Sequence, residues 1–384
     1  MNTPAPYDLA PLGALLVVGA LLALAPLGWV WLRERRPTPA ARLQALTWVT
    51  LFLTFDLVLF GAFTRLTDSG LGCPDWPGCY GHASPLGATG HIDAAQQSTP
   101  TGPVTHSKAW IEMTHRYLAT GVGALIVVLA VWNWIAARLR TVGAAPGIAV
   151  LTLAWVCLQG AFGAWTVTMK LYPAIVTLHL FGGIGLLVLL AWQTRAAEPR
   201  ATPLPGRLRA GLWLLAGVGV VQIALGGWVS TNYAVLACSD FPTCQGAWWP
   251  PMDFEQAFRL RRELGAGAGG EYLPFAALTA IHMAHRLGAA LLLSVLAGVV
   301  WGLAASQDAE VRRWAWLLAG VGLWQVMTGL GNVLLGWPLA AAVAHTGGAA
   351  ALAVVLTLLL RRALPHRSAE PAACPAGVSA RPAS

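Results

Sequence analysis

The chain has 384 residues, of which 57% are hydrophobic and only 10% are charged, and its formal net charge is +8. This composition lies far outside the range of soluble domains and is typical of multispanning membrane proteins. The positive charge does not indicate a nucleic-acid partner, because most basic residues fall in the connections between apolar segments. We therefore expect an integral membrane protein that contacts lipid and binds no nucleic acid.

Apolar segments of about 20 residues, the length that crosses a bilayer, recur along the whole chain. Their number predicts nine transmembrane helices and an all-α integral membrane fold. They lie at residues 11–32, 43–64, 111–137, 147–168, 173–193, 210–230, 277–304, 314–335 and 339–360.

The first apolar segment differs from a cleaved signal peptide. It is preceded by Asp8 and by no basic residue, its apolar stretch is long, and Arg33, Arg35 and Arg36 follow it. Signal peptides instead begin with positive charge and have a shorter apolar stretch. We predict an extra N-terminal transmembrane helix, which together with its basic loop occupies residues 1–42.

Most basic residues lie in alternate connections, and therefore on one side of the predicted membrane protein. By the positive-inside rule, connections rich in lysine and arginine are cytoplasmic. The N-terminus is therefore expected outside and the C-terminus inside a bacterial-type cell membrane. The basic residues that fall in alternate connections are Arg33, Arg35, Arg36, Arg42, Arg138, Arg140, Arg195, Arg200, Arg207, Arg209, Arg312, Arg313, Arg361, Arg362, Arg367 and Arg381.

A long internal repeat begins at the end of the second apolar segment. Residues 61–81, GAFTRLTDSGLGCPDWPGCYG, align without gaps with residues 226–246, GGWVSTNYAVLACSDFPTCQG. The two segments share two cysteines each, at Cys73, Cys79, Cys238 and Cys244. Disulfides persist in an oxidising outer compartment. A metal site is the alternative, but five intervening residues in widely separated loops are not a usual zinc pattern.

Two further cysteines and three histidines carry no clear pattern. Cys157 lies inside a span and Cys374 in the C-terminal tail, and both are expected to be free thiols. The outer connection 82–109 is rich in Gly, Ser, Thr and Pro and contains His82, His91 and His106. Their spacing does not support a metal site, so we interpret these histidines as solvated.

The segment that follows, IEMTHRYLA at residues 111–119, places Glu112, His115 and Arg116 on one face of a helix. Residues 281–289, IHMAHRLGA, repeat it with His285 and Arg286, and His282 replaces the glutamate. Ionisable residues inside a membrane are rare and costly, so their recurrence at matched positions favours a chemical role over a packing role.

Each half continues with two more spans. Gln159 and Gly163 are repeated as Gln325 and Gly329, where glycine most simply permits close helix approach. His179 near the start of one fourth helix is repeated as His345.

These repeats predict two tandem four-helix bundles, at residues 43–193 and 210–361. Because the two units have the same orientation, a pseudo-two-fold axis along the membrane normal relates them. Residues 194–209 form the linker, and residues 362–384 have the composition of a disordered tail.

Two imidazoles facing each other across a helical bundle are what a six-coordinate haem iron requires. The sequence therefore indicates one haem site in each bundle, with His115 and His179 in the first. The alternative is a buried hydrogen-bonded histidine or a proton relay. Arg65, Arg116 and Arg286 are candidates to hold haem propionates, because guanidinium groups suit carboxylates. Snorkelling to the interface is the competing explanation.

Glu112 distinguishes the two sites, because only the first has a carboxylate one turn before its histidine. We infer that the first site does chemistry and that the second holds a permanent redox haem. The alternative for Glu112 is an ion pair with Arg116 four residues on.

In these residues the chain resembles the haem A synthase family. The resemblance covers residues 43–361 and includes the TRLTDSGL segment at 64–71, the cysteine loop with its Trp-Pro pair, the E-x-x-H-R motif and the H-R pair at His285. It also includes the fourth-helix histidines. The chain departs from the family pattern in its extra N-terminal helix, its long outer connection 82–109 and His282. The last competes with His285 as a ligand, and we favour His285 because His115 shares its position and its following arginine.

The resemblance implies oxidation of a methyl group of haem O to a formyl group by two successive hydroxylations, giving haem A for cytochrome c oxidase. It implies that His115 and His179 face the substrate haem, that His285 and His345 ligate haem b, and that Glu112 lies beside the substrate. Cys73 with Cys79, and Cys238 with Cys244, correspond to the family's outer-loop cysteines. Haem O synthase, oxidase assembly components and an unidentified electron acceptor are the expected partners.

We hypothesise that Glu112 accepts a proton or stabilises positive character during oxidation, and that the cysteine loops have a redox or lid function. Three other classes remain open. A dihaem b-type cytochrome that only transfers electrons needs the same four histidines, and a haem carrier would bind haem reversibly without product. A transporter is disfavoured because the polar groups cluster at the outer edge rather than at a midplane site.

Overall fold

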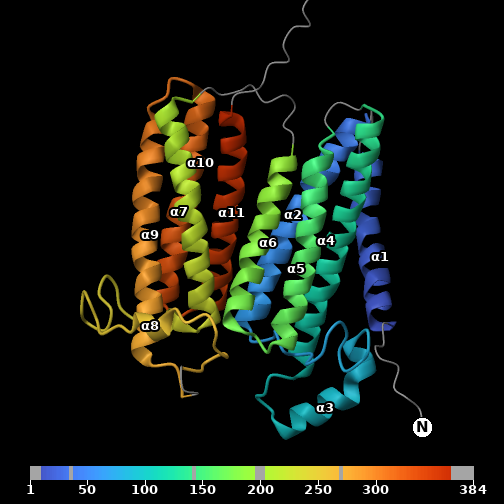
Figure 1. The fold of residues 1–384 in the computed structure, drawn as a ribbon, viewed down its shortest axis with the longest axis vertical. Helices are drawn as coiled ribbons and strands as arrows, with labels where there is room; N and C mark the ends of the chain where they lie inside the picture. The colour runs from blue at the N-terminus through green and yellow to red at the C-terminus, as the bar shows by residue number, and fades with distance from the viewer. Residues whose placement is uncertain (1–9, 34–37, 141–143, 195–203, 268–270, 365–384) are drawn as a thin grey trace, which may run out of the picture.

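The computed structural model describes residues 10–33, 38–140, 144–194, 204–267 and 271–364 (Figure 1). Within these ranges the secondary structure is helical apart from three isolated bridges, and nine helices are long and apolar enough to cross a membrane. The prediction of an all-α, multi-pass membrane protein is therefore confirmed.

The nine long helices begin and end close to the predicted apolar segments. The largest differences, five residues, are at the beginnings of α4 and α10, where polar first turns extend the helix beyond its apolar stretch. Thr105 caps α4 by accepting a hydrogen bond from the Lys108 N–H at 3.3 Å, as expected of an N-cap threonine. The helices are α1 (Ala10–Arg33), α2 (Pro39–Leu66), α4 (His106–Arg138), α5 (Pro146–Thr168), α6 (Pro173–Gln193), α7 (Gly206–Thr231), α9 (Phe275–Ala304), α10 (Ala309–Leu334) and α11 (Leu339–Ala363).

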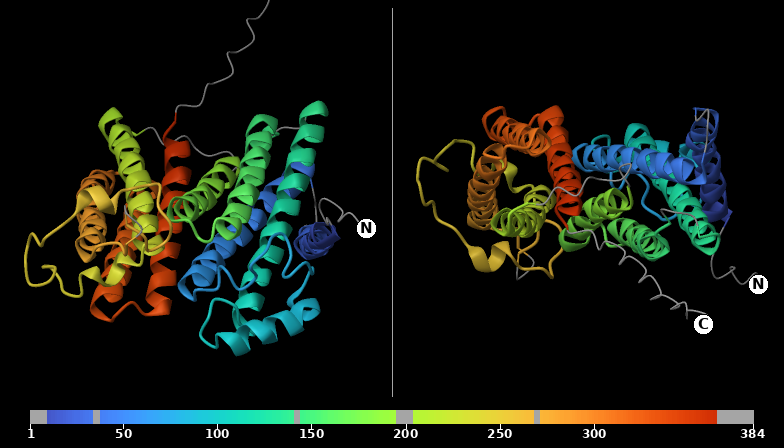
Figure 2. Two further views of the ribbon diagram at one scale, coloured as in Figure 1. Left: turned by 60° about the horizontal axis from the view of Figure 1, so that its bottom comes forward. Right: turned by 90° about the horizontal axis from the view of Figure 1, so that it is seen from above.

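The long helices form two rings of four. In the first, α2 and α5 each pack against α4 and α6, and in the second, α7 and α10 each pack against α9 and α11. The view along the helices shows both rings side by side (Figure 2).

Between the rings, α6 packs against α7, α2 against α11, and α6 against α11. Exchanging the two halves leaves this pattern of contacts unchanged, as a two-fold relation requires. The residue boundaries of the two units stay a prediction.

The extra helix α1 lies outside the first ring, against α4 and α2 (Figure 1). Its close contact with α4 depends on Gly19, because a Cβ there would lie 2.5 Å from Cγ2 of Thr120. This helix therefore packs on the bundle and contributes no residue to the paired histidines.

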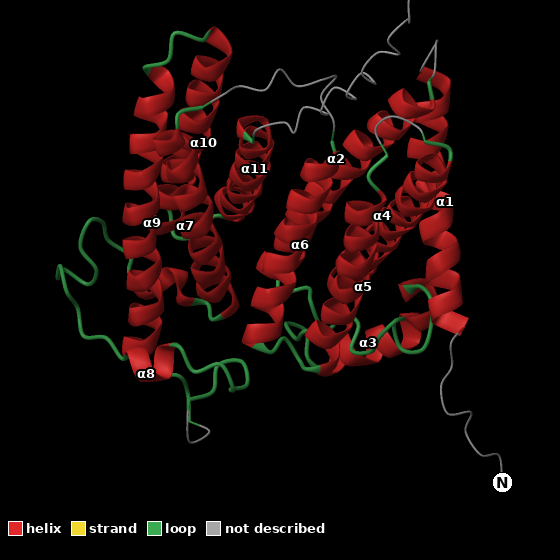
Figure 3. Ribbon diagram, turned by 45° about the horizontal axis from the view of Figure 1, so that its top comes forward, coloured by secondary structure: helices red, strands yellow, loops and turns green. Residues whose placement is uncertain are grey.

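Short helices cover one end of both bundles, which we call the disulfide end because both cysteine loops lie there (Figure 3). They are η1 (Pro85–Ala88), α3 (Thr89–Ser98), η2 (Ala234–Ala237) and α8 (Phe254–Ala257). The sequence analysis treated residues 82–109 as a loop, whereas α3 occupies part of it and buries Ile92.

The opposite end holds the basic connections, and which end faces the cytoplasm stays a prediction. The described basic residues there are Arg33, Arg42, Arg138, Arg140, Arg207, Arg209, Arg312, Arg313, Arg361 and Arg362. Outside the described residues lie Cys374, the predicted tail from residue 365, linker residues 195–203, and Arg35, Arg36, Arg195, Arg200, Arg367 and Arg381.

Leucine-rich cores fill the part of each bundle away from the disulfide end. The first includes Leu46, Leu125 and Leu187, and the second includes Leu212 and Leu303. The paired histidines lie in the other half of each bundle, next to the cysteine loops.

Candidate functional site

The structure brings the four predicted histidines together in pairs. His115 on α4 lies close enough to His179 on α6 to interact with it electrostatically. In the second bundle the rings of His285 on α9 and His345 on α11 have centroids 6.4 Å apart, with their planes at 81°. Each bundle thus has two imidazoles from its second and fourth helices.

A glycine on a neighbouring helix makes room for each of the four rings. A Cβ on Gly61 or Gly226 would lie 3.1 Å from Cε1 of the facing histidine, His115 or His285. Gly163 and Gly329 face His179 and His345, where a Cβ would lie 3.5 and 3.2 Å from Cε1. Only the second of these distances is tighter than an ordinary contact. The sequence analysis assigned the last two glycines to helix approach, and the structure shows in addition that each faces an imidazole ring.

The second pair has the spacing that a shared metal ion needs. Metal–imidazole bonds of about 2 Å place the centroids of two rings on opposite sides of one metal about 6 Å apart. The 6.4 Å between the His285 and His345 rings fits this geometry. Paired imidazoles that glycines accommodate therefore suit a bis-histidine haem.

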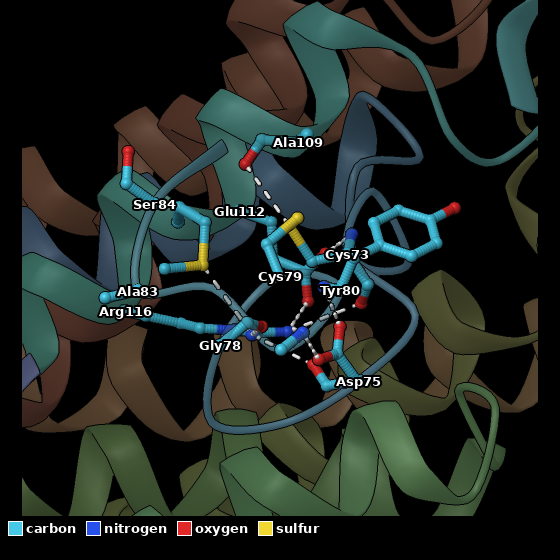
Figure 4. Close-up of a disulfide and its surroundings, with 12 residues drawn as sticks. Cys73, Asp75, Gly78, Cys79, Tyr80, Ala83, Ser84, Ala109, Glu112 and Arg116 are labelled. Carbon is cyan, nitrogen blue, oxygen red and sulfur yellow. Dashed lines mark hydrogen bonds and ion pairs between the residues drawn. A yellow bond between two sulfur atoms is a disulfide. The ribbon is translucent and has the colours of Figure 1, made fainter. Parts of the chain in front are cut away.

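Glu112 connects the first histidine pair to the cysteine loop. Its carboxylate is 4% exposed and accepts two hydrogen bonds, at Oε1 from Nη2 of Arg116 at 2.6 Å and at Oε2 from the Cys73 N–H at 2.7 Å (Figure 4). The ion pair with Arg116, one of the two roles that the sequence left open, is therefore formed. It leaves the carboxylate fixed one turn before His115.

Arg116 holds the first cysteine loop by its carbonyl groups. Its Nη1 donates to the carbonyl oxygens of Asp75 at 3.0 Å, Pro77 at 3.1 Å and Gly78. Its side chain is buried, and the loop carbonyls and Glu112 occupy its donors. The observed role of Arg116 is to hold the cysteine loop, and its role in binding a haem propionate stays a prediction.

Arg286 does the same in the second bundle. It donates to the carbonyl oxygens of Thr243 and Asp240, both at 2.8 Å, and to that of Cys238 at 3.3 Å. The H-R pair therefore has a shared structural consequence: the residue after each candidate ligand fixes the cysteine loop of its own half.

An aspartate organises the turn inside each cysteine loop. Asp240 accepts hydrogen bonds from the Thr243 hydroxyl at 2.5 Å and from the N–H groups of Gln245 and Gly246 at 2.7 and 3.0 Å. The Thr243 hydroxyl and these N–H groups lower the pKa of Asp240 to about 2. Asp75 accepts the equivalent bonds from the N–H groups of Tyr80 and Gly81.

Both cysteine pairs form disulfides. Cys73 is joined to Cys79 and Cys238 to Cys244, with Cα–Cα distances of 4.8 and 4.7 Å. All four sulfur-bearing residues are buried against the second helix of their own bundle. Cys157 is a free, exposed thiol on α5.

Arg65 lies between the two halves. Its Nη2 donates to the carbonyl oxygen of Ser230 at 2.7 Å, and its guanidinium stacks on the Tyr233 ring at 4.1 Å. The Tyr233 hydroxyl in turn donates to Asp68 at 2.5 Å, and Asp68 pairs with Arg65. The predicted propionate ligand of the first site thus binds the end of α7 in the second half.

His282 takes the place of Glu112 but has a different neighbour. It is buried and hydrogen-bonded to the backbone of Ala234 in η2. Because His285 and not His282 faces His345, the geometry favours His285 as the ligand.

The outer histidines stay on the surface. His82 and His91 are exposed, and His106 pairs with Asp93 at 2.6 Å. Among the described residues, no group of three or more His, Cys, Asp or Glu side chains has a metal-site arrangement.

Three polar residues inside the spans were missed by the sequence analysis. Gln222 and Thr328 contact His285 and His345, and comparing the repeat position by position would have revealed them. Asp56 is an exposed carboxylate within α2, and an acidic residue in an apolar segment is a signal for function.

Comparison with known proteins identifies the family. The family model COX15-CtaA, described as cytochrome oxidase assembly protein, matches residues 44–357. The heme A synthase of Shewanella oneidensis is 39% identical over 325 residues, which are 82% of this chain and 95% of that protein. The heme A synthases of Methylobacterium sp. and Bradyrhizobium sp. are 31% and 30% identical, each over 84% of this chain and 92% of their own length. The chain belongs to the cytochrome oxidase assembly protein family COX15-CtaA.

Proposed function

We propose that this protein is a haem A synthase, which oxidises a methyl group of haem O to a formyl group by successive hydroxylations and supplies haem A to cytochrome c oxidase. Relatives of that name align with more than four-fifths of the chain. The observation that carries the reaction is a difference between two sites of the same plan: both have paired histidines that face glycines, and only the first has Glu112.

The first bundle is the proposed substrate site. His115 and His179 orient the substrate haem, and Gly61 and Gly163 leave space for their rings. Glu112 is held by Arg116 and Cys73 and cannot swing freely, so its charge is preorganised beside the reacting haem. We assign to it the acceptance of a proton or the stabilisation of positive character as the methyl group is oxidised.

The second bundle is the proposed site of a resident haem b, held by His285 and His345. This haem supplies one-electron transfer. The leucine-rich core beneath it excludes water, and Arg286 keeps the cysteine loop closed over the outer end.

The surroundings of the enzyme follow from the same proposal. The N-terminus lies outside and the C-terminus in the cytoplasm, so both haem sites lie near the outer surface. Haem O arrives from haem O synthase, haem A passes to oxidase assembly components, and an electron acceptor accepts the electrons that the oxidation releases.

Haem extraction from a host that supplies haem O but makes no haem A tests the proposal, with chromatography and mass measurement of the product. We expect haem A, or its hydroxymethyl precursor, only when the protein is expressed. Unchanged haem O beside bound haem b, with a competent electron acceptor present, would instead establish an electron-transferring dihaem cytochrome. Reversible haem binding without either result would establish a carrier.

A further inference from the structure

Thr328 on α10 is hydrogen-bonded to the ring of His345. Its Oγ1 lies 3.0 Å from Nδ1 of His345 and 2.7 Å from the carbonyl oxygen of Trp324. We assign the hydroxyl hydrogen to Trp324, because a carbonyl oxygen can only accept and this contact is the shorter of the two. The Oγ1 lone pair then accepts a hydrogen bond from the Nδ1–H of His345.

This arrangement selects one form of the imidazole. A neutral histidine carries its proton on one ring nitrogen and leaves a lone pair on the other. With the proton of His345 on Nδ1, the lone pair is on Nε2, the nitrogen free to bind iron. Hydrogen bonds of this kind orient metal ligands and increase their basicity.

The other histidine of the second bundle also has a partner. The amide nitrogen of Gln222 lies 3.0 Å from Nδ1 of His285 and 3.1 Å from its backbone carbonyl oxygen. Because an amide nitrogen only donates, this contact does not place the proton of His285 on Nδ1 as Thr328 does for His345. Gln222 and Thr328 are both buried, so bulk water does not compete for these contacts.

The first bundle has apolar residues at both corresponding positions. Phe162 precedes Gly163 as Thr328 precedes Gly329, and Leu57 lies four residues before Gly61 as Gln222 lies before Gly226. In the described part of the chain, Nδ1 of His115 and Nδ1 of His179 are buried without a hydrogen-bond partner. The histidines of the first bundle therefore lack the constraint found in the second.

We infer that Thr328 is a positioning residue that fixes His345 in its iron-binding form and thereby helps the second bundle to retain its haem. The absence of such partners leaves His115 and His179 free to accept one haem and release another. This inference rests on the proposed function, because that function places a resident haem in one bundle and an exchanging haem in the other.

The test compares Thr328→Val, which removes the hydroxyl and keeps the shape, with Thr328→Ser, which restores it. Thr357→Val is the matched control, because Thr357 is a buried threonine of the second bundle whose hydroxyl bonds only a helix carbonyl, that of Ala353. The readouts are the rate at which purified protein loses haem to apomyoglobin and the electron paramagnetic resonance spectrum of the bound haem.

We expect Thr328→Val to lose haem about 10-fold faster, the usual effect of removing such a partner, with an altered spectrum. Thr328→Ser and Thr357→Val should match the parent. Equal rates and spectra for Thr328→Val and the parent overturn the inference. If Thr328→Val does not fold, Thr328→Ala, which also removes the hydroxyl and adds no bulk, gives the same test at His345.

If His285→Ala binds as much haem as the parent protein, the proposed haem b site itself is contradicted. If instead His285→Ala loses haem but Thr328→Val matches the parent in haem loss rate and spectrum, only the role of Thr328 is contradicted. The two failures are therefore distinguishable.

Discussion

Oε2 of Glu112 accepts a hydrogen bond from the backbone N–H of Cys73 at 2.7 Å, so one carboxylate joins the histidine-bearing helix to the disulfide loop. Any substitution of Glu112 therefore acts on the loop as well as on the proposed haem site. The two effects can be separated because each depends on a different property of the side chain, its hydrogen-bonding capacity or its charge.

We predict that Glu112→Gln and Glu112→Ala both abolish haem A production, because both remove the charge. Both variants lose the ion pair with Arg116. Glu112→Gln retains one oxygen that can accept the Cys73 N–H, whereas Glu112→Ala leaves that buried donor unpaired and is less stable than Glu112→Gln by about 1–3 kcal/mol. Haem extraction measures the first effect, and thermal unfolding with the rate of Cys73–Cys79 reduction measures the second. Parental haem A production by well-expressed Glu112→Gln would remove the proposed catalytic role.

Arg286 is predicted to protect the second disulfide. Arg286→Lys cannot reach the three loop carbonyls that the guanidinium bonds, since one ammonium group lacks the fork geometry. Cys238–Cys244 should then be reduced several-fold faster by a phosphine, as followed by alkylation and mass measurement. Cys73–Cys79, which Arg116 holds, is the internal control and should react at its parental rate. An unchanged rate at Cys238–Cys244 would show that the loop is stable without Arg286.

Gly226 is predicted to be required for haem binding in the second bundle. In Gly226→Ala the new methyl group lies 3.1 Å from Cε1 of His285, so the ring must shift. Gly217→Ala is the matched control on the same helix, because its Cβ meets nothing within 4 Å, and alanine there stabilises the helix by about 1 kcal/mol. The ratio of haem to purified protein should fall in Gly226→Ala alone. Equal haem content in the two variants would contradict the role of the glycine.

Asp240 is predicted to make the second cysteine loop sensitive to acid. The folded-state pKa of about 2 is below the unfolded value of about 4. The carboxylate therefore stabilises the loop above about pH 4, and this stabilisation is lost as the pH falls toward 2. Reduction of Cys238–Cys244 by a phosphine should be slower in the parent than in Asp240→Asn at neutral pH. The difference should disappear near pH 2, and a difference that persists there would show that the carboxylate charge is not the cause.

The membrane helices and paired histidines were predictable because their signals are local or repeated. Hydropathy is a property of each segment, and the repeat gives the positions of His115 and His285 without any knowledge of the fold. The beginning of α10 was missed by five residues because Glu310 and Arg312 belong to the helix but not to its apolar stretch.

The contacts of the arginines could not be predicted in the same way. Arg116 follows the candidate ligand directly, which favoured a haem propionate as its partner. Its observed partners are carbonyl oxygens about 40 residues earlier in the chain, from Asp75 to Gly78. They depend on the path of the folded loop, which leaves no periodic signal in the sequence. The hydroxyl of Thr328 is similar, because its significance lies in a ring on another helix.

The contact of Arg65 with Ser230 and Tyr233 has a consequence for electron flow. Together with the packing of α6 against α7 and α11, it ties the two bundles into one unit at the end where both histidine pairs lie. If each site held a haem, this connection would keep the two sites at a fixed separation. Electron transfer between them would then depend on the difference in their reduction potentials and not on an encounter between moving domains.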